Sequence, residues 1–176
     1  MSGVTDEIAS EALKHFATPK NYGEMADAVG VGIGYDSATS NYATIYLKLS
    51  GQKIENAKYV AHGSEDIVIL GSIFTEMIEG DSLQNAIERA KELEKEVQAA
   101  YDAIEPPKVD LSKPEGEQVE AVSTESQDAA NIVLTAFKAA VRHIERKEEG
   151  IVEDHFKISI AKRCPYSNSD CALSAH

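Results

Sequence analysis

The chain has 176 residues, 43% of them hydrophobic, which is enough for one domain with a sizeable core and an added extension. Its 30 acidic and 17 basic residues give a formal net charge of −13, which argues against nucleic acid as a partner, because phosphate binding needs clustered Lys and Arg. No stretch approaches the roughly 20 apolar residues of a membrane span, and the polar start lacks the basic and apolar regions of a signal peptide, so we expect a cytoplasmic protein.

The first part of the chain predicts one helix followed by three strands. Residues 5–16 place apolar side chains at helical spacing, and the helix should end before Pro19. Three runs of β-branched and aromatic residues follow, at residues 29–34, 43–49 and 53–61. We therefore expect an antiparallel meander of about three strands.

The period of the apolar residues then changes from that of strands to that of helices. Within residues 67–78 the apolar side chains recur at helical spacing, which predicts a helix with one apolar face. Residues 81–84 have the spacing of a capping box, which predicts the start of a long second helix. Residues 124–127 form another capping-box pattern, which opens a helix with a continuous apolar side. Residues 156–160 alternate as expected for an edge strand.

Strands followed by helices predict an α+β fold, in which a small antiparallel sheet of about three strands has helices packed on one face. Residues 105–123 contain three prolines and several charges, so we expect a loop or an insertion there. This divides the chain into a domain at residues 1–150 and a C-terminal extension at residues 151–176. Within the domain, His15 should be packed at the end of the first helix, whereas His143 should lie at the surface.

Four strings along this framework follow the order of segments in one protein family. They are HFATPKNYG at residues 15–23, IENAKY at residues 54–59, TEMIEGDSL at residues 75–83 and EPPKV at residues 105–109. Over residues 6–109 and 128–144 the chain resembles the NifU/IscU family of iron-sulfur cluster assembly scaffold proteins. The resemblance implies the family's fold and a cysteine desulfurase or a cluster-acceptor protein as partner, and it leaves a homo-oligomer open.

The chain departs from this family at the residues that hold the cluster. The resemblance implies three cysteines and one aspartate as ligands, and the matching positions carry Thr39, Asn41, Ser64 and Ala129 instead. Of the four matches, the one to Ala129 depends most on the alignment, because the insertion expected before the last helix shifts the count of residues. Because thiolates are the main ligands of iron-sulfur clusters, we do not expect ordinary scaffold chemistry at these vacated positions.

The entrance to the helix after the third strand has two interpretations. Ser64 is a favoured N-cap residue, and Glu65 and Asp66 in the first turn would complement the helix dipole, so the lost ligand can have become a helix cap. Alternatively, His62, Glu65 and Asp66 can form an oxygen and nitrogen site for a harder metal ion.

Both cysteines of the chain lie in the C-terminal extension. Cys164, Cys171 and the terminal His176 can supply three ligands to zinc, iron or an iron-sulfur cluster, with a fourth from His62, His155 or a second subunit. An extension that folds back to the end of the sheet would return sulfur to the vacated positions. The alternative is that both thiols are free, as is common near chain ends.

Three functions remain open. The first is a scaffold-like protein of iron-sulfur cluster assembly that binds iron, a cluster or sulfur through ligands unlike the family's. The second is a metal-free paralogue that binds and regulates a cysteine desulfurase or a cluster client, and the third is a zinc-binding protein that uses the C-terminal cysteines. We do not expect an enzyme, because no nucleophile-base pairing, phosphate-binding glycine loop or metalloprotease helix motif is found.

Overall fold

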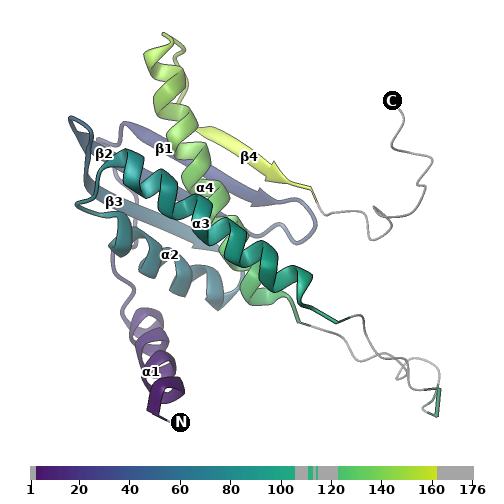
Figure 1. The fold of residues 1–176 in the computed structure, drawn as a ribbon. Coiled ribbons are helices and arrows are strands. Elements are labelled where there is room, and N and C mark those ends of the chain that lie inside the picture. The colour runs from purple at the N-terminus through teal and green to yellow at the C-terminus, as the bar shows by residue number, and fades with distance from the viewer. Residues whose placement is uncertain (1–2, 106–110, 113, 115–122, 162–176) are drawn as a thin grey trace, which may run out of the picture.

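The computed structural model describes residues 3–105, 111–112, 114 and 123–161. It consists of one sheet covered by helices on one side (Figure 1). None of the helices in these described ranges is long and apolar enough to cross a membrane. The elements in chain order are α1 (Gly3–Ala17), β1 (Gly30–Asp36), β2 (Tyr42–Ser50), β3 (Lys53–His62), α2 (Glu65–Ile78), α3 (Leu83–Asp102), α4 (Glu125–Glu148) and β4 (Phe156–Ile160).

The sheet has four strands in the order β3-β2-β1-β4. The predicted antiparallel meander is confirmed, because β2 pairs antiparallel with both β1 and β3. The predicted edge strand is also present, but β4 runs parallel to β1, with Phe156 opposite Gly32 and Ile160 opposite Asp36. The fold is therefore α+β as expected, with a mixed sheet in place of a purely antiparallel one.

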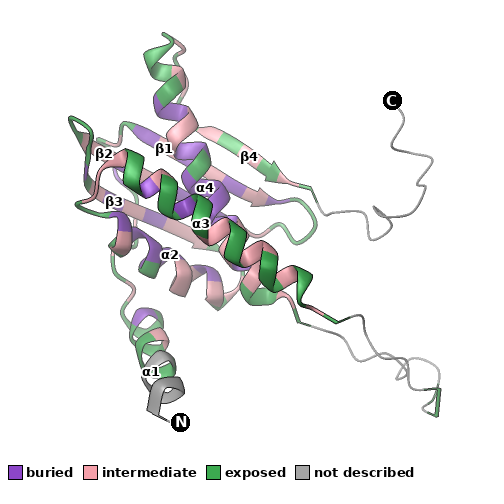
Figure 2. Cartoon of the chain, in the orientation of Figure 1, coloured by how far each residue is buried: buried purple, intermediate pink, exposed green. Residues whose placement is uncertain are grey.

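The core lies between the sheet and α4, where β1 presents only glycines. Gly30, Gly32 and Gly34 face α4, and a Cβ atom at Gly32 would lie 1.9 Å from the backbone nitrogen of Ala140. The side of α4 that approaches β1 carries the buried small residues Ala136 and Ala140. Figure 2 shows buried residues gathered where this helix crosses the sheet. The backbone of α4 therefore rests directly on the backbone of β1, which fixes the position of the helix over the sheet.

The two expected capping boxes differ from the structure in detail. The N-cap of α3 is Ser82, one residue later than expected, and its hydroxyl accepts a hydrogen bond from the backbone N–H of Asn85 at 3.1 Å. The N-cap of α4 is Thr124, whose side chain makes no capping bond and instead donates to Asp128 at 2.7 Å. α4 therefore begins where the sequence predicted and α3 begins one residue later, and of the two only α3 has a side-chain cap.

Two histidines are fixed inside the fold. His15 is packed as expected, with Nδ1 at 2.8 Å from the hydroxyl of Ser72. The surface position expected for His143 is wrong, because this residue is fully buried. Its Nδ1 accepts from the N–H of Val31 at 2.9 Å, and its Nε2 lies 2.9 Å from the carbonyl oxygen of Glu153. His143 follows Ala140 by three positions, which places it on the apolar side of α4.

Candidate functional site

One edge of the sheet gathers the ends of several elements. Because β1, β3 and β4 run in the same direction, their C-terminal ends meet at this edge, where β2 begins (Figure 1). The loop from β1 to β2 carries Thr39 and Asn41, Ser64 follows the end of β3, and Ala129 lies in the second turn of α4. A cavity of about 320 Å³ is lined by all four of these positions. The vacated positions, which are far apart in the sequence, are therefore neighbours in space.

Asp36 at the end of β1 organises the loop that carries two of these positions. It is only 6% exposed, and its carboxylate accepts the Thr39 hydroxyl at 2.8 Å and the N–H of Ala38 at 2.9 Å. Its own N–H donates to the carbonyl oxygen of Asn41 at 2.8 Å. The Thr39 hydroxyl is thus engaged in holding the loop. Sequence reasoning missed Asp36, although an Asp three residues before a Thr is a common turn-forming pattern.

Asn41 and Ser64 meet across the glycine that ends β3. Gly63 has a φ of +122°, and a Cβ atom there would lie 2.4 Å from Oδ1 of Asn41, so the asparagine side chain lies against the glycine. Ser64 occupies the N-cap position of α2 as expected, but its side chain makes no capping hydrogen bond. Glu65 and Asp66 lie in the first helical turn, as the helix-cap interpretation requires.

The start of α4 forms the opposite wall of the cavity. Asp128 accepts hydrogen bonds from the Tyr101 hydroxyl at 2.5 Å and from Thr124 at 2.7 Å. Burial, together with the hydrogen bond to the Asp128 carboxylate, raises the pKa of Tyr101, so the phenol stays protonated and continues to donate. The next residue, Ala129, is 1% exposed and contributes only a methyl group to the cavity.

A second cavity of about 480 Å³ lies beside the first and shares Asp36 and Asp128 with it. It extends along α3 to Asp102 and reaches the end of β4 at Ile160 and Ala161. Neither cavity has a Lys, Arg or His among the described residues that line it. The two cavities together form what we call the acidic trough, whose carboxylates belong to Asp36, Asp102, Glu125 and Asp128.

The described residues do not build a metal centre. No group of three His, Cys, Asp or Glu side chains within the described ranges can hold a metal ion. His62 instead stacks on Tyr42, with ring centroids 5.3 Å apart, and Asp66 accepts a hydrogen bond from Ser126. The cavity offers hydroxyl, amide and carboxylate groups, so it does not fit an iron-sulfur cluster, which needs thiolates.

The expected tail ligands lie outside the part of the chain that the structure describes. These residues are Cys164, Cys171 and His176. The described chain ends at Ala161, directly after β4 and at the rim of the acidic trough.

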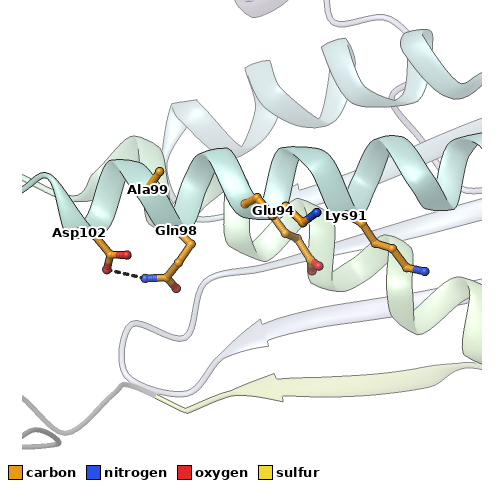
Figure 3. Close-up of a pocket in the computed structure, with 6 residues that line it drawn as sticks. Lys91, Glu94, Gln98, Ala99 and Asp102 are labelled. Carbon is orange, nitrogen blue, oxygen red and sulfur yellow. Dashed lines mark hydrogen bonds between the residues drawn. The ribbon is translucent and has the colours of Figure 1, made fainter.

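Two other features have structural explanations. A shallow pocket of about 490 Å³ is lined by side chains of α3 alone. Figure 3 shows these side chains along the helix, with the hydrogen bond that Gln98 donates to Asp102 at 2.8 Å. Its Glu94 forms an ion pair with Lys138 of α4 at 2.5 Å, as in an ordinary solvated helix face.

The hydrogen bond between Ser72 and His15 was not predicted from the sequence. Ser72 is completely buried, and its hydroxyl also accepts a hydrogen bond from the backbone N–H of Lys20. Ser72 therefore joins the end of α1 to α2.

Comparison with known proteins gives consistent family matches. The family described as "NifU-like N terminal domain" matches residues 7–149. The iron-sulfur cluster assembly scaffold protein IscU 1 of Archaeoglobus fulgidus is 30% identical over 79 residues, which are 45% of this chain and 52% of that protein. The IscU scaffold protein of Aquifex aeolicus is 29% identical over 83 residues, or 46% of this chain and 53% of that protein. The chain thus spans about half the length of the curated relatives that it matches.

The solved structures support the fold. The N-terminal part of a nitrogen-fixing NifU-like protein from Brucella abortus superposes with a TM-score of 0.51 at 13% sequence identity. The superposition covers 82% of this chain and 98% of that one. At this level of identity the likeness concerns the fold alone.

Proposed function

The chain belongs to the NifU-like N terminal domain family, and from this premise we propose that it acts in iron-sulfur cluster assembly as a scaffold-type protein. The observation that carries the proposal is the cavity at the sheet edge. Four positions that the sequence matches to family ligands line it together, although none of them carries a thiol. The relatives named as assembly scaffolds support the same class of role.

Sulfur ligands must then come from another part of the chain. The sequence contains only Cys164 and Cys171, and His176 adds an imidazole. We assign these three residues as the ligands of iron, a cluster or zinc, because thiolates and imidazole are the donors that these metals share. The cluster in this role is cargo that is assembled and passed on, so the protein itself is not an enzyme.

A cysteine desulfurase or a cluster-acceptor protein is the proposed partner. Cargo must be received and released, which requires a surface that such a protein recognises. The net charge of −13 favours a partner with a basic docking face, because complementary charge speeds encounter and suppresses wrong partners.

Anaerobic reconstitution with ferrous iron, sulfide and a thiol reductant tests the ligand assignment. We expect visible absorbance and bound iron in the native chain, and the loss of both in a Cys164→Ala/Cys171→Ala variant. The matched control is Ser167→Ala/Ser169→Ala, which changes the same segment without removing a thiol and should keep the signal. Equal metal content in all three proteins, or none in any, would overturn the assignment.

One observation favours a second candidate, a metal-free paralogue that binds and regulates a desulfurase or a cluster client. The Thr39 hydroxyl and the carboxylates of Asp36 and Asp128 are already engaged in hydrogen bonds within the protein. This is the pattern of a site whose polar groups stabilise the fold and do not bind a metal. Affinity capture of a purified cysteine desulfurase in the presence of a chelator separates the two. A stable complex that the double cysteine variant also forms, together with failed reconstitution, would support the paralogue.

A further inference from the structure

The first helix, α1, leaves most of its side chains uncovered. Figure 1 shows it standing away from the rest of the molecule, and among the described elements it packs mainly on α2. Within residues 9–17 only His15 is buried, whereas Leu13 is 66% exposed and Phe16 is 42% exposed. A short helix is marginally stable in water and gains most of its stability by packing an apolar face. Leu13 and Phe16 are three positions apart, so α1 presents an apolar face that the described residues do not cover.

A second apolar surface lies between α2, α3 and α4. It is a groove of about 130 Å³, and every residue that lines it is apolar. We call it the apolar groove, and its lining includes Ile73 and Met77 of α2, Leu93 and Val97 of α3, and Leu134 of α4. Ile73 is 37% exposed, so the groove is open to solvent. The chain thus carries both an uncovered apolar helix and an uncovered apolar groove.

The hydrogen bonds at the end of α1 hold it on a different side of α2 from the groove. His15 and the backbone N–H of Lys20 both contact the hydroxyl of Ser72, and the Lys20 side chain forms an ion pair with Glu76, one turn further along α2. Successive residues of a helix are about 100° apart around its axis, so this side is rotated by about 100° from the side that carries Ile73. No residue of α1 lines the groove. α1 therefore does not fill the groove of its own chain.

The charges favour these two surfaces as a contact between copies of the chain. At a net charge of −13, two copies repel each other over most of their surface. None of the residues that line the groove is charged. On the described part of α1, Glu11 and Lys14 form an ion pair at 3.4 Å, so their charges cancel beside the exposed apolar residues. A helix of this kind enters an uncharged groove without adding to the repulsion.

The area of such a contact is sufficient for a weak dimer. α1 has 15 residues, so it is about 22 Å long and about 10 Å wide. When two copies each insert α1 into the groove of the other, the contacts cover about 900 Å² in total, counted on both surfaces of each contact. Flanking side chains add to this area, which brings it near the roughly 1,200 Å² at which specific interfaces begin. We therefore expect a reversible dimer with a Kd on the order of micromolar.

We propose that the protein forms a symmetric homodimer in which α1 of each copy lies in the apolar groove of the other, with Leu13 and Phe16 against the lining side chains. Contacts of a helix in a groove use apolar side chains three or four positions apart as anchors. Each copy supplies one helix and one groove, so a twofold axis relates the two contacts and closes the assembly. The dimer does not rest on the proposed function, because neither surface includes a vacated position or a cysteine.

Sedimentation velocity of the full-length chain, over about a hundredfold range of concentration, measures the dimer. Leu13→Ala/Phe16→Ala removes the anchors and keeps α1 helical, because Ala is the strongest helix former, and it should raise the dimer Kd about tenfold or more. Ile73→Asp places a charge in the groove and should have the same effect. Val152→Asp is the matched control, because it makes the same kind of change at a residue that is 98% exposed and outside both surfaces. It should keep the native Kd.

A mixing experiment distinguishes this arrangement from contact between two α1 helices. The α1 double variant keeps an intact groove and Ile73→Asp keeps an intact α1, so an equimolar mixture restores one of the two contacts. We expect more dimer in the mixture than in either variant alone. Raised salt should strengthen the native dimer, because it screens the repulsion between two acidic chains.

Four results would overturn the proposal. They are a monomer at every concentration, a dimer that both variants leave unchanged, a mixture with no more dimer than its components, and a dimer that Val152→Asp abolishes. Far-ultraviolet circular dichroism shows whether each variant is folded, and Ile73→Ser replaces Ile73→Asp if the latter is not. No metal, sulfide or partner protein is present, so these results are independent of cluster reconstitution.

Discussion

At residue 32, β1 has no side chain because the backbone of α4 occupies the space where one would lie. A methyl group there would lie 1.9 Å from a backbone nitrogen and 2.3 Å from the carbonyl oxygen of Ala136, and neither atom can move without shifting the helix. We expect Gly32→Ala to destabilise the fold by about 3 kcal/mol, the upper end of typical overpacking costs. Urea unfolding followed by circular dichroism measures this. Ser159→Ala, an exposed change on β4, is the control and should stay within about 0.5 kcal/mol of the native chain. A stable Gly32→Ala protein would contradict the close approach of α4.

The vacated positions can be refilled with thiols. Thr39→Cys, Ser64→Cys and Ala129→Cys together with Asn41→Asp should create a cluster-binding cavity, because all four positions line one space. Both native cysteines are replaced by serine in this test, so that the tail cannot contribute. We expect reconstituted absorbance and bound iron that are absent when the thiols are placed instead at residues 50, 52 and 159. If the two proteins behave alike, the matched positions are not a ligand set.

Single residues also show what the sequence could predict about the site. The resemblance to the family placed its ligand positions at Thr39, Asn41, Ser64 and Ala129, by counting from neighbouring strands and helices. All four line one cavity in the structure. Their side-chain contacts could not be predicted. A Ser at an N-cap position usually accepts a capping hydrogen bond, but the Ser64 side chain, which lines the cavity, accepts none.

At the scale of elements, the existence of β4 was predictable from the sequence, whereas its place and direction in the sheet were not. Its alternating pattern predicted a strand, and the strand exists. Its pairing with β1 could not be predicted, because β1 lies more than 100 residues earlier in the chain and the sequence pattern contains no information about direction. The burial of His143 depends on the same packing, since its ring bridges β1 and the segment that leads to β4.

Truncation tests whether β4 is part of the folding unit. A chain that ends at residue 150 loses β4 and leaves the fully buried His143 without the carbonyl of Glu153. We expect it to lose about 3 kcal/mol or more, from half-buried apolar residues and an unsatisfied polar group, which corresponds to roughly 10 °C in Tm. A chain that ends at residue 161 keeps both features and should melt like the full-length protein. Equal melting of the two truncations would place the domain boundary at residue 150.

The link between α4 and the segment before β4 predicts a pH dependence. The Arg146 guanidinium donates to both carboxylate oxygens of Glu153, at 2.6 and 3.1 Å, and this hydrogen bonding lowers the pKa of Glu153. A lowered pKa adds stability above the unfolded value of about 4.3, and that stability is lost as pH falls through the folded value. The Tm of Glu153→Gln should therefore fall less than that of the native chain between neutral pH and pH 3. Glu148→Gln, an exposed change on α4, should follow the native curve.

At the scale of the whole molecule, the net charge of −13 predicts how the protein would associate with the partner proposed above. Association with a cysteine desulfurase that has a basic docking face should weaken about tenfold between low and physiological salt, because salt screens the attraction between exposed charges. Isothermal titration at several ionic strengths measures the change in Kd. An affinity that does not respond to salt would indicate an apolar contact instead.

The overall architecture was the most predictable property of the chain. The order of strands and helices, together with the strings at residues 15–23 and 75–83, led to the α+β fold and to the family that the comparisons show. Each of these sequence patterns is local, and several occur along the chain, so a wrong assignment of one strand or helix does not change the predicted fold class. The convergence of loops at one sheet edge is a long-range property, and it needed the three-dimensional structure.

The glycines of β1 also bear on how such a protein can diverge. At Gly30, Gly32 and Gly34 any side chain would collide with α4, so a substitution there would disturb the packing of the helix whatever the protein's task. Thr39, Asn41 and Ser64 lie on loops and at a helix start, where exchange leaves the strand and helix pairing intact. A lineage can therefore lose its ligands one by one and still inherit the same framework. Descendants of this kind are better sought by their glycine strand and alanine-lined helix than by their cysteines.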